Sequence, residues 1–351
     1  MSKFGKTTAR GFSLIELMVA MGILSVLMLM LTMVLDQVQQ SWTRAESRIS
    51  QFREARVAFD IMTKNLSQSS LNTYWDLLDE DKDGLVDGYY RTSELHFEVM
   101  RASELGRNDG QEPVGHAVFF QAPLGFSIQY PNLNNLFNGR GYFVAFGSDE
   151  DFRPSFLQTA NRYRYRLLEF RPPAEDNQVF ADGGEERDEG RPQEFTEWFH
   201  QGMSNVGEGD FGQHLNPLAE NILTLIISPR DSIVDSVEGR DETASEIAPQ
   251  YLYNSNDIDS IATAQQVPPL VRVTMIAIDE ASAIRVENGT SPPSEIHSLV
   301  ESPLRQTENY EEDIKQIVDS LEEARISHKV FSSMVLLRSA KWSESSGVAY
   351  P

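Results

Sequence analysis

The first hydrophobic segment of the chain is long enough to cross a membrane. Phe12 to Leu35 contains Glu16 as its only charged residue. At about 1.5 Å per residue a helix of this length measures about 36 Å, which exceeds a hydrocarbon core of about 30 Å. Lys3, Lys6 and Arg10 precede the segment without an acidic residue, and a basic flank is typical of the cytoplasmic end. The pattern predicts one membrane-spanning helix followed by an exported chain.

Two simpler explanations account for the segment less well. A cleaved secretory signal has an apolar core of about 7–15 residues and then a small-residue cleavage site, and the residues after Leu35 provide no such site. A plain membrane anchor fits the length but leaves Glu16 unexplained, because a carboxylate inside a span is costly and usually functional.

The helical pattern continues beyond the apolar segment. From Val38 to Leu66 hydrophobic residues recur at spacings of three and four, and no Gly or Pro occurs between Ile23 and Leu71. We therefore predict one helix with a transmembrane part, 12–35, and an exported part, 36–71. The exported part would bury its apolar stripe against a globular domain. A free coiled coil is the alternative, but the aromatic residues in the stripe favour packing on a sheet.

Residues 72–351 have the pattern of a β-rich globular domain. Short apolar runs separated by turn residues are typical of strands. The expected strands are Leu95–Val99, Ala117–Phe120, Tyr142–Phe146, Tyr163–Phe170, Asn221–Ser228, Leu270–Asp279 and Lys329–Ala340. Pro123 and Pro229 are expected to end two of them. With the long N-terminal helix, the fold class is α+β, a helix packed on an antiparallel sheet with loop insertions.

Two further features complete the domain. Glu308 to Ser327 has the pattern of an amphipathic helix, in which Asn309 and Glu312 have the spacing of a capping box. The acidic stretch at about 172–192 is expected to form an exposed insertion, and a second acidic, polar loop without fixed structure is expected at about 230–263.

Arginines gather in one part of this acidic chain, between positions 140 and 171. They are Arg140, Arg153, Arg162, Arg164, Arg166 and Arg171. We expect them to form a solvated strand face, and binding of an acidic partner subunit is the alternative.

One acidic segment has the spacing of a calcium-binding loop. Asp79, Asp81, Asp83 and Asp87 occupy loop positions 1, 3, 5 and 9, a glycine stands at position 6, and Leu85 would supply a backbone carbonyl. Position 12 is a tyrosine where such loops carry a bidentate glutamate, so affinity would be weakened unless Glu94 contributes. The segment is predicted to bind Ca²⁺, and an acidic surface turn without metal is the alternative.

The N-terminal sequence also resembles a known class of export signal. Arg10-Gly11-Phe12-Ser13-Leu14-Ile15-Glu16-Leu17, followed by an apolar helix, is similar to the class III signal of type IV prepilins and type II secretion pseudopilins. The resemblance implies a leader at 1–11, cleavage by prepilin peptidase between Gly11 and Phe12, and methylation of the Phe12 amine. It also implies that Glu16 pairs with a neighbouring subunit's terminal amine, which neutralises two charges that are each costly in lipid.

Two weaker resemblances concern the rest of the chain. The segment Arg56–Leu66 and the strands around Val271 and Val335 resemble the minor pseudopilins of the J class. More loosely, the length and the Phe- and Arg-rich middle are similar to the cassette protein C group of verrucomicrobial pilin-like proteins.

Composition and motif content argue against several other functions. The net charge of −23 disfavours nucleic acid as a partner. Without cysteine the chain has no disulfide, no thiol nucleophile and no thiolate zinc site. The six histidines are scattered, and neither a Gly-x-Ser-x-Gly elbow nor a phosphate-binding Gly-Lys-Ser/Thr loop occurs. We therefore expect a structural protein and not an enzyme.

The resemblance implies a minor pseudopilin of a type II secretion-like pseudopilus. It would lie in the bacterial inner membrane as a single-pass protein with a cytoplasmic N-terminus before processing and a periplasmic domain. Its partners would be prepilin peptidase, other pseudopilins or minor pilins, and the membrane. The alternatives are a minor pilin of a type IV pilus and a calcium-dependent adhesin or binding module that uses pilin export.

Overall fold

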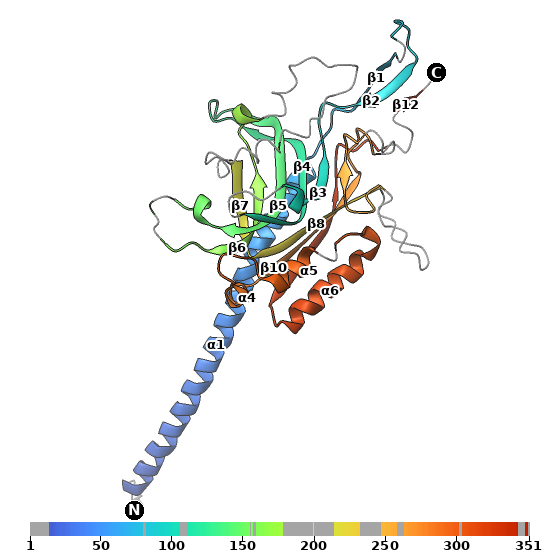
Figure 1. Ribbon diagram of the computed structural model, residues 1–351. Coiled ribbons are helices and arrows are strands. Elements are labelled where there is room, and N and C mark those ends of the chain that lie inside the picture. The colour runs from blue at the N-terminus through green and yellow to red at the C-terminus, as the bar shows by residue number, and fades with distance from the viewer. Residues whose placement is uncertain are drawn as a thin grey trace, which may run out of the picture. The chain divides into compact units, whose positions relative to one another are not determined.

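A computed structural model gives the fold of this chain (Figure 1). The residues that it describes are 14–79, 82–105, 111–154, 156, 159–177, 199, 214–231, 247–257, 263–301, 304–342 and 348–349. The contacts divide the chain into two compact units, Met1–Ser50 and Gln51–Pro351. We describe each unit separately.

Helix α1 runs from Leu14 to Leu66, 53 residues, in agreement with the predicted long helix. It ends five residues before Leu71, where the expected exported part of the helix stops. The physical reason lies in the side chains that follow: Ser67 Oγ and Gln68 Nε2 both donate to the Lys64 carbonyl at the end of the helix. Such local side-chain bonds satisfy the last carbonyls and compete with further helix.

In the second unit the last four turns of α1 form one wall of the hydrophobic core. Ala55, Ala58, Phe59, Met62 and Leu66 are all buried and recur at helical spacing. They belong to the same core cluster as the inward-facing strand residues. The predicted packing of the apolar stripe on a sheet is therefore confirmed, and a free coiled coil is excluded for this part of the helix.

Most of the second unit is antiparallel sheet. The larger sheet has six strands in the order β7-β6-β5-β4-β3-β9. Its strands are β3 (Glu98–Arg101), β4 (Glu112–Phe126), β5 (Asn134–Ser148), β6 (Tyr163–Phe170), β7 (Leu215–Glu220) and β9 (Tyr253–Asn254). With the helices, this architecture is the α+β class predicted from the sequence.

Two three-stranded sheets complete the unit, in the orders β11-β10-β8 and β1-β2-β12. Their strands are β8 (Ile222–Arg230), β10 (Leu270–Ile278), β11 (His328–Leu336), β1 (Tyr74–Leu78), β2 (Gly88–Thr92) and β12 (Val348–Ala349). The remaining helices are α4 (Glu280–Val286), α5 (Ser294–Glu301) and α6 (Tyr310–Glu323), with 3-10 turns at Ala102–Leu105, Glu150–Phe152, Ala174–Asp176 and Thr307–Asn309. Figure 1 shows α6 beside β10, where the Tyr310 hydroxyl hydrogen-bonds Thr274 at 2.6 Å.

The register of β10 with β11 is regular over nine residue pairs. Val271 lies opposite Val335, and Ile278 opposite His328. The two late apolar segments around Val271 and Val335 are therefore neighbouring antiparallel strands. Phe331 of β11 reaches α1, where its ring centroid lies 5.8 Å from that of Phe59.

Both prolines that were expected to end strands lie inside them. β4 continues to Phe126, and its pairing with β5 is irregular between Ala122 and Gly125, where Pro123 lies. β8 continues through Pro229, which lies opposite Val271. The backbone groups of Val271 point to β11 and not to β8, so proline removes no ladder bond there. Proline is tolerated at bulges and on edge strands for these reasons.

The late amphipathic helix is also present, with a different beginning from the one expected. α6 starts at Tyr310 and buries Ile317 and Leu321. Asn309 precedes it, but its side chain makes no capping hydrogen bond, so the predicted capping box is wrong. A 3-10 turn over Thr307–Asn309 leads directly into the helix, and it leaves Asn309 with φ −92° and ψ 8°, outside the extended conformation usual for a cap.

Candidate functional site

The N-terminal part of α1 carries the first candidate site. Gly11 and Phe12, the predicted cleavage and methylation positions, lie outside the described residues. Glu16 lies in the first turn of the helix, and its side chain is exposed. An acidic residue there is favourably placed beside the positive end of the helix dipole.

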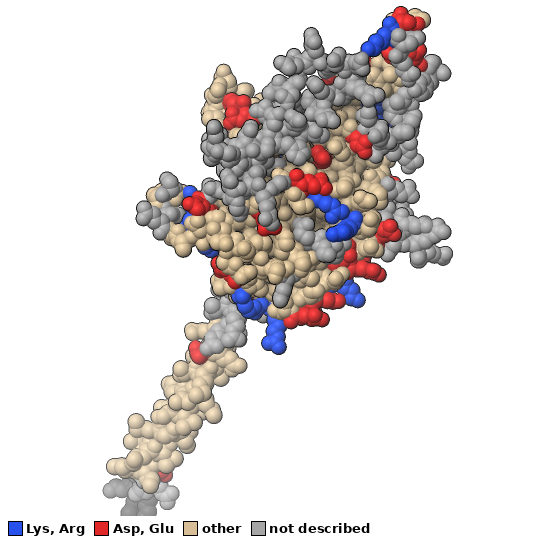
Figure 2. Space-filling view, in the orientation of Figure 1, with Lys and Arg blue, Asp and Glu red and all other residues tan. Residues whose placement is uncertain are grey.

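The surface of this part of the helix is apolar. Leu14–Gln39 is long and apolar enough to cross a membrane, and none of its most hydrophobic window is buried. Figure 2 shows it as an almost continuous tan surface, interrupted by the acidic residues near its ends. Within unit one, an exposed hydrophobic surface of this extent fits a membrane anchor and not a helix folded into a soluble core.

The described residues of the acidic segment lie between β1 and β2. Asp79 accepts hydrogen bonds from two backbone N–H groups across the turn, Asp83 at 3.2 Å and Gly84 at 3.0 Å. Asp83 accepts one from Leu85 N–H at 2.7 Å. Gly84 has φ +85°, a conformation that glycine adopts at little cost. The glycine therefore serves the sharp turn, as the loop spacing predicted.

The donor chemistry of this turn suits a hard cation. Carboxylate and carbonyl oxygens are the ligands that Ca²⁺ prefers, and Asp79, Asp83, Leu85 and Asp87 lie on one tight turn, whereas Asp81 lies outside the described residues. Among the described residues no group of three carboxylates or imidazoles converges to hold a metal. Glu94, considered as an extra ligand, instead accepts hydrogen bonds from Asn72 and from Tyr74 OH.

The arginine cluster is a third candidate site, and it differs from the solvated face that was expected. The guanidinium groups of Arg140, Arg164 and Arg166 are almost fully buried, with side chains 6%, 6% and 2% exposed. Arg164 and Arg166 lie on the same face of β6 as the core residues Leu168 and Phe170, so they enter the interior. The solvated-face prediction is therefore wrong for these three residues.

Each buried guanidinium has a carboxylate partner from another element. Arg140 pairs with Glu169 at 3.1 Å, Arg166 with Glu220 at 3.3 Å, and Arg164 with Glu287 at 3.0 Å. The sequence of β6 could not indicate these ion pairs, because two of the three carboxylates, Glu220 and Glu287, are distant in the chain. Burying a charged side chain costs much free energy unless an opposite charge pairs with it.

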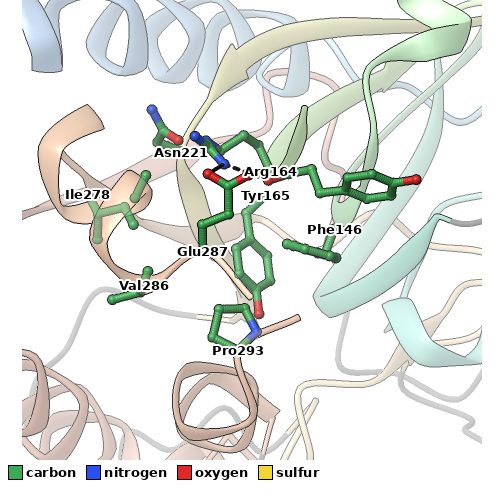
Figure 3. A pocket seen from close by; sticks show the side chains of 10 residues that line it. Phe146, Arg164, Tyr165, Asn221, Ile278, Val286, Glu287 and Pro293 are labelled. Atoms are coloured by element: carbon green, nitrogen blue, oxygen red, sulfur yellow. Dashed lines mark hydrogen bonds and ion pairs between the residues drawn. The ribbon is translucent and has the colours of Figure 1, made fainter. Parts of the chain in front are cut away.

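The Arg164–Glu287 pair borders a small hollow between β6 and the end of α4 (Figure 3). Phe146, Tyr165, Val286 and Pro293 line the apolar side. The hollow measures about 20 Å³, which is room for a water molecule and not for an organic substrate. Arg164 and Arg166 therefore join β6 to the end of α4 and to β7, respectively.

Arg166 allows a direct test of this structural role. Besides Glu220, its guanidinium donates to the carbonyls of Gly147 at 2.8 Å and Arg162 at 3.1 Å. Burial lowers its pKa, and Glu220 opposes that effect. We expect Arg166→Ala to lower the free energy of unfolding by about 2–3 kcal/mol, somewhat below the full cost of breaking a buried pair because Glu220 is one-third exposed.

Arg162 is the matched control for that measurement. It also pairs with Glu220 and Glu280 but is 47% exposed, so Arg162→Ala should cost about 1 kcal/mol or less. Urea unfolding of the full chain in detergent, followed by tryptophan fluorescence, compares the two variants. Equal losses of stability in both would contradict the structural role assigned to Arg166.

Comparison with known protein families identifies the N-terminal site. The model of the prokaryotic N-terminal methylation motif matches residues 6–32. The match spans the positions of Gly11, Phe12 and Glu16 and most of the exposed apolar helix. No significant match is found among curated proteins or solved structures.

This motif is the signal of type IV pilins and pseudopilins, and it indicates a type IV pilin-like or pseudopilin precursor. The motif implies processing by prepilin peptidase and assembly with other pilins. The single apolar helix fits the membrane anchor of such a protein. A pilin-type motif suggests a structural protein.

Proposed function

We propose that the chain is a minor pseudopilin, a structural subunit of a type II secretion-like pseudopilus. The observation that carries this proposal is the methylation motif at the start of a long helix, exposed over Leu14–Gln39 and followed by a large β-rich unit. Before cleavage the N-terminus lies in the cytoplasm of the bacterial inner membrane, and the second unit lies in the periplasm. Prepilin peptidase cleaves after Gly11 and methylates Phe12, and Glu16 then directs assembly.

The size of the second unit supports the minor role. Gln51–Pro351 is one compact unit of about twice the usual size of a domain. Subunits that repeat along a filament shaft stack their domains closely, and a unit this large would crowd its neighbours. A subunit that occurs once, at the end of the filament, avoids that restriction.

Cross-linking in the native membrane tests this function against its alternative. The tagged full chain is treated with a membrane-permeable cross-linker in its own cells and purified, and its partners are identified by mass spectrometry. The proposal expects several low-abundance pilin-like subunits encoded with secretion genes. Recovery of a major surface pilin as the main adduct would favour the minor pilin of a type IV pilus.

We also propose that the turn after β1 binds Ca²⁺ through Asp79, Asp81, Asp83, Asp87 and the Leu85 carbonyl. The support is the spacing of the carboxylates, the oxygen-only donor set and the positive φ of Gly84. The tyrosine at position 12 predicts weak binding, in the range of extracellular calcium modules. A calcium-dependent adhesin exported by the pilin route would use the same loop.

Calcium should raise the melting temperature of the full chain in detergent. At ten times the Kd a ligand of the native state contributes about 1.4 kcal/mol, which corresponds to roughly 3 °C for a unit of this size. The melting temperature is compared in millimolar calcium and in chelator. Asp83→Ala should abolish the shift and Asp76→Asn, on the adjacent strand, should preserve it. An equal shift in all three proteins, or none in the unaltered chain, would count against the site.

A further inference from the structure

β11 presents a long open sheet edge. Of its nine residues, five are exposed, and within the described part of the chain it pairs with β10 alone. Leu337 N–H donates to the Pro269 carbonyl on the β10 side. Because alternate residues of an antiparallel strand bond to the same neighbour, the backbone groups of Val330, Ser332, Met334 and Leu336 point away from β10.

The other described sheet edges lack this regularity. β7 contains Pro217 and β8 contains Pro229, and the pairing of each with its neighbouring strand is shifted at one place. β9 and β12 have two residues each, and β1 has five, with Asp76 at its centre. Short strands, proline, bulges and charges are the features that protect natural sheet edges from pairing. β11 has nine residues in unbroken register, no proline, and Lys329 as its one fully charged residue.

The open edge of β11 lies beside the end of helix α1. Phe331 contacts Phe59 of α1, Arg338 N–H donates to the Ser67 carbonyl at 3.3 Å, and Ser339 Oγ donates to the carbonyl of Ser69. The N-terminal motif implies that this chain assembles with other pilins. A subunit that assembles along the helix would therefore come close to β11.

We propose that the open edge of β11 accepts an extended strand from a neighbouring pilin-like subunit and so extends the β8-β10-β11 sheet. The row of outward N–H and C=O groups is the chemistry that recognises an extended backbone. Met334 and Leu336, 36% and 62% exposed, offer apolar contacts to alternate side chains of that strand. This inference rests on the proposed function, because it requires a pilin-like partner.

Charge indicates which strand fits. Lys329 stands at one end of the edge, and Arg338 and Lys341 follow the other end, so carboxylates near the ends of the incoming strand would be favoured. A second copy of this chain is a poorer partner, because two molecules of net charge −23 repel each other.

Met334 is the position for a selective block. Its N–H points outward, so Met334→Pro removes a donor from the edge and none from the ladder with β10. Ser333, the residue before this position, already has the extended conformation that proline requires of its predecessor. Met334→Thr is the matched control, because it changes the same side chain and keeps the N–H. Ser332 is less suitable, since its hydroxyl bonds Thr274 at 2.9 Å.

The test uses the full chain in its own cells, with the photoreactive residue p-benzoylphenylalanine replacing Leu336. We expect an adduct to an extended segment of another pilin-like subunit, reduced at least tenfold by Met334→Pro and unchanged by Met334→Thr. An adduct to a second copy, to a helix or to another segment of this chain would overturn the proposal. An adduct that survives Met334→Pro would also overturn it, as would the absence of any adduct.

Amide exchange provides a measurement that does not depend on the proline variant. In the purified full chain the outward amides of Val330, Ser332 and Met334 should exchange quickly, and in the purified complex with partner subunits they should exchange at least tenfold more slowly. Equal rates would overturn the proposal. If partner subunits are never recovered with the unaltered chain, the proposed function itself fails. If they are recovered while these amides stay unprotected, only the inference about the edge fails.

Discussion

Replacing Gly11 with leucine should leave the full-length precursor in the membrane with less than a tenth of normal processing. The peptidase must bring the peptide bond between Gly11 and Phe12 into its active site, and glycine offers no side chain to obstruct that approach. A branched side chain next to the scissile bond would hinder it. Processing is measured by the change in gel mobility of the tagged chain after a pulse of synthesis.

Gly22 is the matched control for this substitution. It lies in the apolar helix, and a side chain there would meet nothing within 4 Å. Gly22→Leu should therefore be processed as well as the unaltered chain. Normal cleavage of Gly11→Leu, or an equal defect in both variants, would show that the junction after Gly11 is not the recognised one.

Replacing Glu16 with leucine should abolish assembly and leave insertion and cleavage intact. Glu16 follows Phe12 by only four positions and lies in the first turn of α1, so we expect it near the membrane edge, where insertion should tolerate either residue. After cleavage, the cationic amine of an axially displaced neighbour can pair with this carboxylate. In a low-dielectric environment the loss of one partner leaves the other charge stranded, at a cost of about 3–5 kcal/mol. That corresponds to a loss of at least a hundredfold in incorporation.

Recovery of the partner subunits by co-purification measures the Glu16 effect. Glu16→Gln should fail in the same way as Glu16→Leu, because an amide keeps the shape and loses the charge. Asp36→Asn is the control, since Asp36 follows the apolar segment at its other end. Normal recovery of partners with a cleaved Glu16→Leu protein would exclude the proposed pairing.

The parts of the fold that periodicity determines could be predicted from the sequence. The spacing of Phe59, Met62 and Leu66 placed one face of α1 in the core, because burial on one side requires that repeat. Apolar runs likewise indicated the strands β4, β5, β6, β8, β10 and β11, whereas β1, β2, β7, β9 and β12 were not predicted. Exact ends were less predictable, since Ser67 and Gln68 end α1 through hydrogen bonds that no periodicity indicates.

The features that depend on long-range contacts could not be predicted. Arg166 is buried because Glu220, 54 positions away, pairs with it, and the sequence of β6 alone favours an exposed alternation. Likewise, the sequence predicts that Pro229 ends its strand, because nothing in the sequence shows that it lies opposite Val271, where its missing N–H costs no ladder bond. The N-terminal motif could be recognised from the sequence because it is local: Gly11, Phe12 and Glu16 lie within six consecutive positions and inside the matched motif, and their roles stay predictions.

The intact mass of the full chain, purified from the membranes of its own cells, tests the central claim most directly. A pilin-like precursor should yield a mature chain that begins at Phe12 and carries one methyl group on its terminal amine. Fragmentation of the N-terminal peptide then places the methyl group on Phe12. A chain that still begins at Met1, or one cut within or after the apolar helix, would contradict the account.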